Sequence, residues 1–293
     1  MLTFFLTFGL CNNINGQITI VELETNDFHP INERLLYLDS LNELQIDNRH
    51  EYYVSLTIIS TNIDSTIMAR IKTYKFTGLQ LDFQACIFIE GSTLMIRDMS
   101  NLESLTFVRC ILEEWDTGIS TCPNLTTLRF YGSELSLFPN DLYKLTKLNI
   151  FVLSTKVFNG NLDFTYMTDL EELDIYIDDT IKEPFASTLC NLNKLKYAIT
   201  SWVSVDTILP ECIGNLASLS SIYSCEIYPP NSVYNNPKIE AVYISPTSIE
   251  MAKYIADKFI EADREVFLCI NNHREHFFDA NWVKNTKIKI CIW

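Results

Sequence analysis

The side chains that could bind a metal ion are concentrated at two places in the sequence. His273-Arg274-Glu275-His276 holds two imidazoles that could face one way on a helix and bind zinc. No third ligand can be identified, so we expect this segment to be a polar turn between two strands. Asp174, Asp178 and Asp179 form the densest acidic group, but they lack the alternate carboxylates and the glycine of a calcium loop. The sequence therefore predicts no metal site.

Motifs that would indicate catalysis or cofactor binding are also missing from the sequence. The chain has only 8 glycines, and none of them forms a glycine-rich phosphate loop. It has no Gly-x-Ser-x-Gly elbow for a nucleophilic serine. We therefore expect no cofactor, and an enzyme is the weakest of the three function classes that we consider.

The nine cysteines do not form a recognisable framework, because a disulfide scaffold is typical of much shorter chains and no Cys-x-x-Cys pair is present. Their positions favour burial in the core over bridging, and Cys110 is expected to face the interior of a turn. Cys269 and Cys291 should lie side by side on neighbouring strands. A bridge between adjacent parallel strands needs unusual geometry, so we predict two free, buried thiols.

The charge of the chain restricts its partners. Asp and Glu outnumber Lys and Arg by 37 to 22, which gives a formal net charge of -15. Such a chain repels the phosphates that provide most of the affinity of nucleic-acid binders, and it repels anionic membrane surfaces. The charge instead favours a basic partner. Beyond the N-terminus, no apolar run reaches the roughly 18 residues of a transmembrane helix, so no transmembrane segment is expected.

The N-terminal residues 1–17 resemble the apolar core and polar end of a secretory signal peptide. Residues Met1 to Cys11 are almost wholly apolar and are followed by a polar run, although no Lys or Arg precedes Gln17. A buried N-terminal strand is the alternative interpretation. The signal peptide is favoured, and it predicts export: secretion, a periplasmic location or the cell surface.

One pattern, apolar-x-x-apolar-x-apolar, recurs along most of the chain. Successive first positions lie 23, 23, 22, 25, 24 and 20 residues apart. This period is far from those of helical arrays and propellers. It predicts one short strand in each unit, with neighbouring units stacked into a parallel sheet. The first positions are Leu102, Leu125, Leu148, Leu170, Leu195, Leu219 and Ile239.

Two segments make the pattern specific to a family. Residues 208–219 resemble the Leu-Pro-x-x-Ile-Gly-Asn-Leu-x-x-Leu segment of plant-type and bacterial surface leucine-rich repeats, and residues 138–148 follow the same logic. The resemblance covers residues 76–245 and implies an α/β fold, a right-handed curved solenoid with a parallel β-sheet on its concave face. The family usually has Asn or Cys at the ninth position, where only Cys110 fits well. The residues at that position are Cys110, Ser133, Lys156, Asp178, Val203 and Ile227.

The two ends depart from the pattern. Residues 18–75 are expected to form an N-terminal cap or degenerate repeats, with a strand over Ile18–Leu23 and a loose match at Leu41-Leu44-Ile46. Residues 246–293 are expected to form an irregular α/β C-terminal cap. Within that cap, apolar residues from Ile249 to Ile260 have helical spacing, and 266–270 and 288–292 are rich in strand-forming residues that would extend the sheet.

Side chains that alternate with the buried apolar residues should line the concave face. Tyrosine occurs at five of these positions, and it is common in recognition surfaces because it combines a large area with one polar group. Ile150, Val152 and Ile199 are expected to add exposed apolar area there. The candidate ligand-binding residues are Arg129, Tyr131, Val152, Asp174, Tyr176, Tyr197, Ile199, Tyr223 and Tyr243.

These observations predict a non-catalytic, exported binding module that recognises a protein or peptide on its concave face. The alternative is a cell-surface adhesive or structural element that binds glycan or matrix through the same aromatic residues. The third function class is an enzyme or a targeting arm of one. For the tyrosines alone, the alternative is that they merely cover one face of the sheet; binding is favoured because apolar residues share that face.

Overall fold

The computed structural model describes residues 18–24, 31–46, 51–89, 91–112, 118–135, 138, 141–156, 162–177, 185–202, 209–225, 228–271 and 283–292. The expected signal peptide over residues 1–17 and the His273–His276 segment lie outside the described residues. The chain divides into two compact units, Met1–Lys147 and Leu148–Trp293, which we call unit 1 and unit 2.

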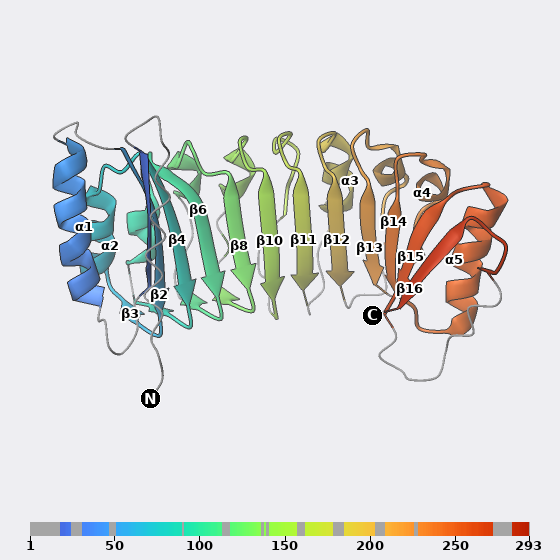
Figure 1. Ribbon diagram of the computed structural model, residues 1–293, viewed down its shortest axis with the longest axis horizontal. Coiled ribbons are helices and arrows are strands. Elements are labelled where there is room, and N and C mark those ends of the chain that lie inside the picture. The colour runs from blue at the N-terminus through green and yellow to red at the C-terminus, as the bar shows by residue number, and fades with distance from the viewer. Residues whose placement is uncertain are drawn as a thin grey trace. The chain divides into compact units, whose positions relative to one another are not determined.

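Unit 1 is built on a parallel sheet whose strands pair in chain order (Figure 1). A second, smaller parallel sheet is formed by two-residue strands that follow the main strands. The main strands are β1 (Ile18–Glu24), β2 (Glu51–Ile59), β4 (Gly78–Gln84), β6 (Leu102–Val108) and β8 (Thr127–Tyr131); the short strands are β3 (Asn62–Ile63), β5 (Ile87–Phe88), β7 (Ile111–Leu112) and β9 (Glu134–Leu135).

A left-handed backbone residue joins each of β2, β4, β6 and β8 to the short strand after it. Ser60, Ala85 and Arg109 have φ values of 49°, 51° and 53°, and Gly132 occupies the same place after β8 with a φ of 58°. Backbone amides at these turns donate to the next repeat, as from Ala85 to the Val108 carbonyl at 2.8 Å. These bonds satisfy backbone groups that the turn would otherwise leave without partners.

The core of unit 1 contains a column of phenylalanine rings. Phe83 stacks on Phe107 with ring centroids 5.5 Å apart, and Phe107 stacks on Phe130 at 5.3 Å. Phe88, from a short strand, meets both Phe83 and Phe107 edge to face. The parallel register pairs Phe83 with Phe107 and Phe107 with Phe130, so strand pairing itself brings the rings together.

Small polar side chains fill the interior of the turns after β4, β6 and β8. The Cys86 and Cys110 thiols donate to the carbonyls of Ile58 and Phe83, each at 3.2 Å. The Ser133 hydroxyl donates to the Phe107 carbonyl at 3.2 Å and accepts from the Cys110 amide at 3.1 Å. Ser133 departs from the Asn or Cys that the family has at the ninth position, but its buried hydroxyl bonds to the same kinds of backbone group.

The segment before β2 is a helix, α1 (Ile31–Ile46), so the strand-like match at Leu41-Leu44-Ile46 is not a strand. Leu35, Leu38 and Leu41 are buried at a spacing of three residues, which a helix and the repeat template share. The Tyr74 hydroxyl donates to the Leu35 carbonyl at 3.0 Å and to Asp39 at 2.9 Å, which fixes α1 against the unit. The other helical segments of unit 1 are α2 (Ser65–Thr73), η1 (Thr93–Ile96), η2 (Ile119–Thr121) and η3 (Leu142–Lys144).

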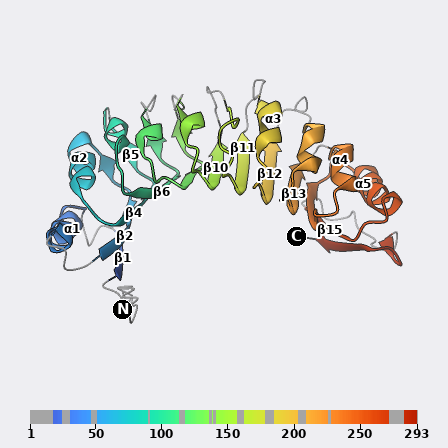
Figure 2. The same cartoon turned by 90° about the horizontal axis from the view of Figure 1, so that it is seen from above.

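Unit 2 is also a parallel sheet paired in chain order, with α3, α4 and α5 on one side of the strands (Figure 2). The predicted helix after Ile249 and the predicted strands at 266–270 and 288–292 are confirmed, and both strands extend the sheet. The strands are β10 (Ile150–Thr155), β11 (Glu172–Ile177), β12 (Tyr197–Trp202), β13 (Ser221–Cys225), β14 (Ala241–Ser245), β15 (Val266–Ile270) and β16 (Ile288–Ile292). The helical segments are α3 (Phe185–Thr188), η4 (Leu189–Asn191), η5 (Glu211–Asn215), α4 (Asn231–Asn235) and α5 (Ile249–Glu261).

Two disulfides cross-link unit 2, so the prediction that Cys269 and Cys291 are free thiols is wrong. The parallel register pairs these cysteines directly, with Cα atoms 4.5 Å apart, a separation that a disulfide can span. A second bond joins Cys190 to Cys212 in successive turns, with Cα atoms 5.4 Å apart. Cys86, Cys110 and Cys122 are free and buried.

Replacing Phe107 with alanine should lower the free energy of unfolding by about 3–5 kcal/mol, because it leaves a cavity between two stacked rings. Phe267 is the matched control: its side chain is 47% exposed, so Phe267→Ala should cost less than about 1 kcal/mol. Urea denaturation of both variants measures the difference. Equal losses would contradict the assignment of Phe107 to a packed column.

Peptide mapping without reductant should recover the Cys190 and Cys212 peptides as one linked species, and likewise Cys269 and Cys291. Each bond closes a loop with a sequence separation of 22 residues. The Cys269→Ser/Cys291→Ser double variant should therefore lose about 3 kcal/mol of stability, mainly because the unfolded chain gains conformational freedom. Complete alkylation of all four thiols in the unreduced, denatured chain would rule the bonds out.

Candidate functional site

The face of the unit 2 sheet opposite α4 and α5, which we call the outward face, bears the side chains that alternate with the core. On β11 the core residues Leu173, Ile175 and Ile177 are buried. The intervening residues form rows across the strands. The first row is Ile150, Glu172, Tyr197, Ser221, Ala241 and Phe267; the middle row is Val152, Asp174, Ile199, Tyr223, Tyr243 and Cys269; the third row includes Ser154, Tyr176 and Ser201.

Large aromatic side chains are partly open to solvent on this face. Tyr176 is 43% exposed, and Tyr197 and Phe267 are each 47% exposed. Tyr223 and Tyr243 are half-buried and stack with ring centroids 6.2 Å apart, and the Tyr223 hydroxyl lies 3.1 Å from the Ser245 hydroxyl. The register thus brings Tyr197, Tyr223 and Tyr243, which were predicted to share a face, onto neighbouring strands.

Phe267 belongs to this aromatic set although the sequence did not identify it. Residues 266–270 are apolar throughout, so no alternation in the sequence separates the buried from the exposed side chains. Strand register identifies Phe267 as an outward residue, because it pairs with Ala241 of the first row. The ammonium group of Lys289 lies over the Phe267 ring, 5.1 Å from its centroid. This face can therefore hold a cation against an aromatic ring.

Asp174 is the one charged residue of the middle row. The register places it between Val152 and Ile199, and burial raises the pKa of its carboxyl to about 6. Among the described side chains, none forms a hydrogen bond or an ion pair with this carboxylate. A partly buried charge without a partner costs folding free energy, and such groups are often found at functional sites.

Val152 and Ile199 are the two predicted apolar members of the face that do not add exposed area in the described structure. Val152 was expected to be exposed but is buried, with 6% of its surface accessible. A valine side chain is short, and side chains directly opposite on neighbouring strands lie close enough to contact it. Ile199 lies on the outward face by register, but its side chain is outside the described residues. The exposed apolar area here is therefore aromatic and does not come from Val152.

Arg129 and Tyr131 lie on β8 in unit 1, separately from the other candidates. Arg129 is half-buried and falls in a row with Thr57, Asp82 and Thr106. Tyr131 is 39% exposed. Both point away from the core, as predicted, and they belong to the corresponding face of unit 1.

Most of the acidic and metal-binding candidates, including His273 and His276, lie outside the described residues. Asp178 and Asp179 lie outside the described residues, so only Asp174 of that group can be placed. Within the described ranges, no three His, Cys, Asp or Glu side chains are arranged to hold a metal ion. Nor does any described helix have the length and apolar character to cross a membrane.

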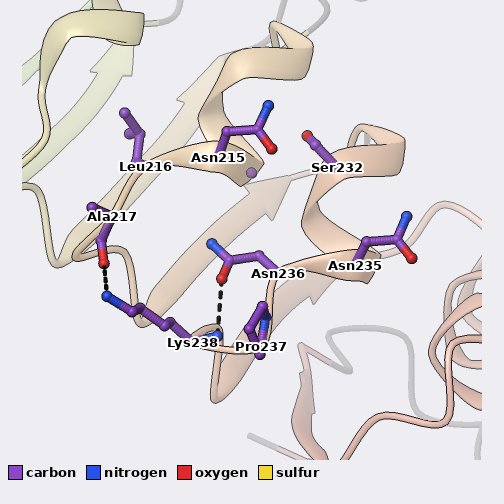
Figure 3. Close-up of a pocket in the computed structure, with 9 residues that line it drawn as sticks. Asn215, Leu216, Ala217, Ser232, Asn235, Asn236, Pro237 and Lys238 are labelled. Atoms are coloured by element: carbon purple, nitrogen blue, oxygen red, sulfur yellow. Dashed lines mark hydrogen bonds between the residues drawn. The ribbon is translucent and has the colours of Figure 1, made fainter.

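A pocket of about 450 Å³ lies between successive turns on the helical side of unit 2 (Figure 3). The Lys238 ammonium group donates to the Ala217 carbonyl at 2.5 Å, so this cation already has a partner. A Cβ on Gly214 would overlap the backbone of Ser232, which explains why glycine follows Ile213 in the predicted motif. The lining residues are Gly214, Asn215, Leu216, Ala217, Ser232, Asn235, Asn236, Pro237 and Lys238.

A second pocket of about 540 Å³ is lined by tyrosine and proline. Tyr228 and Tyr254 meet edge to face, with ring centroids 5.1 Å apart. Glu211 accepts hydrogen bonds from the Ser232 amide at 2.9 Å and the Asn231 amide at 3.1 Å, and these bonds lower the pKa of its carboxyl. Lys238 and Glu211 thus have hydrogen-bond partners within the protein, whereas the partly buried Asp174 carboxylate on the outward face has none among the described side chains.

Comparison with known proteins does not assign this chain to a family. No protein-family model matches the sequence, and no curated protein matches it with significant similarity.

Replacing Asp174 with asparagine should stabilise the protein at neutral pH. A carboxyl whose pKa is about 6 when folded and about 4 when unfolded binds protons more tightly in the folded state, so the wild type loses stability as pH rises through this window. Two pKa units correspond to about 3 kcal/mol, and solvent screening reduces this to about 1 kcal/mol. Denaturation at about pH 7.5 and about pH 3.5 measures the gain, which should vanish at the lower pH.

Asp257→Asn is the matched control, because Asp257 is exposed on α5. It should change stability by less than about 0.5 kcal/mol at either pH. If Asp174→Asn were less stable than the wild type at neutral pH, the carboxylate would have a stabilising partner, and our description of it would be wrong.

Proposed function

We propose that this chain is a non-catalytic leucine-rich-repeat binding module that recognises a protein or peptide on its outward face. The observation that supports this most strongly is the aromatic set of Tyr176, Tyr197 and Phe267, each more than two-fifths exposed on one sheet face. Aromatic side chains are enriched in interfaces, and they lose little conformational entropy when a partner covers them.

Several features of unit 1 favour the leucine-rich-repeat assignment. Residues that pair on neighbouring strands are 23 to 25 positions apart from β2 to β8, with a left-handed residue after each of these strands. Cys86, Cys110 and Ser133 occupy equivalent turn positions, and their side chains donate hydrogen bonds to backbone carbonyls of the preceding repeat. Each repeat buries its apolar face only by stacking on its neighbours, which is the principle of a repeat fold.

The chemistry of the face favours a polypeptide partner. A sheet face with aromatic rings, the two carboxylates of Glu172 and Asp174 and several hydroxyl groups offers apolar contact together with hydrogen bonds, which is the composition of protein interfaces. The net charge of -15 disfavours nucleic acid and favours a basic partner.

We also propose that the protein is exported. The two disulfides support this, because such bonds persist in oxidising compartments outside the cytosol. The apolar segment over residues 1–17 agrees with export, as an N-terminal signal would direct it.

A glycan or matrix ligand is the second candidate function. The exposed rings of Tyr197 and Phe267 lie in one row of the face, separated by β13 and β14, and could each cover an apolar surface of a sugar. In this case the protein would be an adhesive element of the cell surface.

Binding of the full chain to an array of random 12-residue peptides, compared with a glycan array, tests the proposal. The Tyr176→Ala/Tyr197→Ala variant should bind the selected peptides at least about tenfold more weakly, because two interface aromatics are each worth about 1 kcal/mol or more. Tyr166→Ala is the matched control: Tyr166 is 58% exposed in a turn outside the sheet, and its loss should leave binding unchanged.

The alternatives give different results. Tyrosine-dependent binding to glycans and to no peptide would support the adhesive element in place of the peptide-binding module. Peptide binding that is lost in Tyr166→Ala and retained in the double variant would refute the assignment to the outward face.

A further inference from the structure

We propose that Asp174 anchors the ligand of this face by binding the arginine or lysine side chain of an extended peptide, while an apolar side chain of the same peptide packs on Tyr223 and Tyr243. This inference rests on the proposed function and names the chemical class of the partner.

The position of Asp174 favours a cationic group over other ligands. Its neighbours in the middle row, Val152 and Ile199, carry no charge, and the rest of that row is Tyr223, Tyr243 and the cross-linked pair Cys269 and Cys291. A carboxylate in such surroundings is poorly solvated, so it gains more from an ion pair than an exposed carboxylate does. An uncharged ligand would bury the carboxylate without compensation.

The stacked rings of Tyr223 and Tyr243 would make the second contact, with an apolar side chain of the peptide. Tyr223 lies on β13, two strands from Asp174 on β11, and Tyr243 lies one strand further. Neighbouring strands are about 4.8 Å apart, so the carboxylate and the Tyr223 ring are separated by about 10 Å along the row. An extended peptide advances about 3.3 Å per residue. The peptide that fits therefore has its basic and apolar residues about three positions apart.

The other titratable groups near Asp174 are few. Glu172 and Tyr176 flank it on β11, and Tyr197 pairs with Glu172 from β12. At the start of β12 the Lys196 ammonium group is paired with Glu171 at 2.6 Å. The outward residues of β10 do not titrate in the accessible range; they are Ile150, Val152 and Ser154.

Ligand binding should strengthen as pH rises through the titration of Asp174. The carboxyl has a pKa of about 6 in the unbound protein, and only its ionised form attracts a cation. At about pH 5 about one carboxyl in ten is ionised, so affinity should be about tenfold weaker than at about pH 7.5.

The test uses the full chain and the 12-residue peptides selected from the random array. Each selected peptide is resynthesised with citrulline in place of arginine or acetyl-lysine in place of lysine, which removes the charge and keeps the length. Binding to the wild type should weaken about tenfold, and binding to Asp174→Asn should be weak for both forms of the peptide and independent of pH. Asp174→Glu should restore part of the affinity, and Asp257→Asn should bind as the wild type does.

Two results would overturn the inference in different ways. Peptides that require Tyr176 and Tyr197 but bind equally with and without the positive charge would leave the proposed function standing and refute the role of Asp174. If no peptide bound in a tyrosine-dependent way, the proposed function itself would fail, and the inference with it. Asp174→Asn is expected to be at least as stable as the wild type, so lost binding would not reflect unfolding.

Discussion

In-register pairing of parallel strands in chain order is the constraint on which the rest of each unit depends. Because residues one repeat apart are brought side by side, like side chains meet like: Phe83 pairs with Phe107, 24 positions away, and Cys269 pairs with Cys291, 22 positions away. No single strand with its turn has enough partners to bury its own apolar residues. The same pairing that builds the core therefore also arranges the side chains that face away from it.

The outward face of unit 2 has features that the core does not require. The buried side of each strand explains the folding of the sheet, whereas Tyr197 and Phe267 each leave 47% of their surface exposed to solvent. Asp174 opposes folding at neutral pH, since burial raises the pKa of its carboxyl. A residue that costs stability among exposed aromatic rings is explained most simply by a ligand that pairs with it.

The sequence predicted the elements whose apolar residues recur at a fixed period. It missed features that depend on how strands pack, and one segment whose spacing fits two kinds of element. The strands that begin near Leu102 and Leu125 were predictable because leucine recurs at a fixed period. The segment at Leu41 was matched to the repeat template but is a helix, because a spacing of three residues suits both. The pairing of Cys269 with Cys291 was predicted, but the bond between them was missed because adjacent parallel strands were expected to hold the cysteines in an unsuitable geometry. The burial of Val152 could not be predicted, because it depends on the side chains that surround it on the sheet.

The central claim is that a ligand occupies the outward face of unit 2 and not its pockets. Photo-crosslinking tests this most directly, with a benzophenone amino acid placed at Tyr197 on the face or at Tyr254, which lines the larger pocket and is 45% exposed. A selected basic peptide should crosslink to the chain modified at Tyr197 and not to the chain modified at Tyr254. Crosslinking at Tyr254 alone would contradict the account.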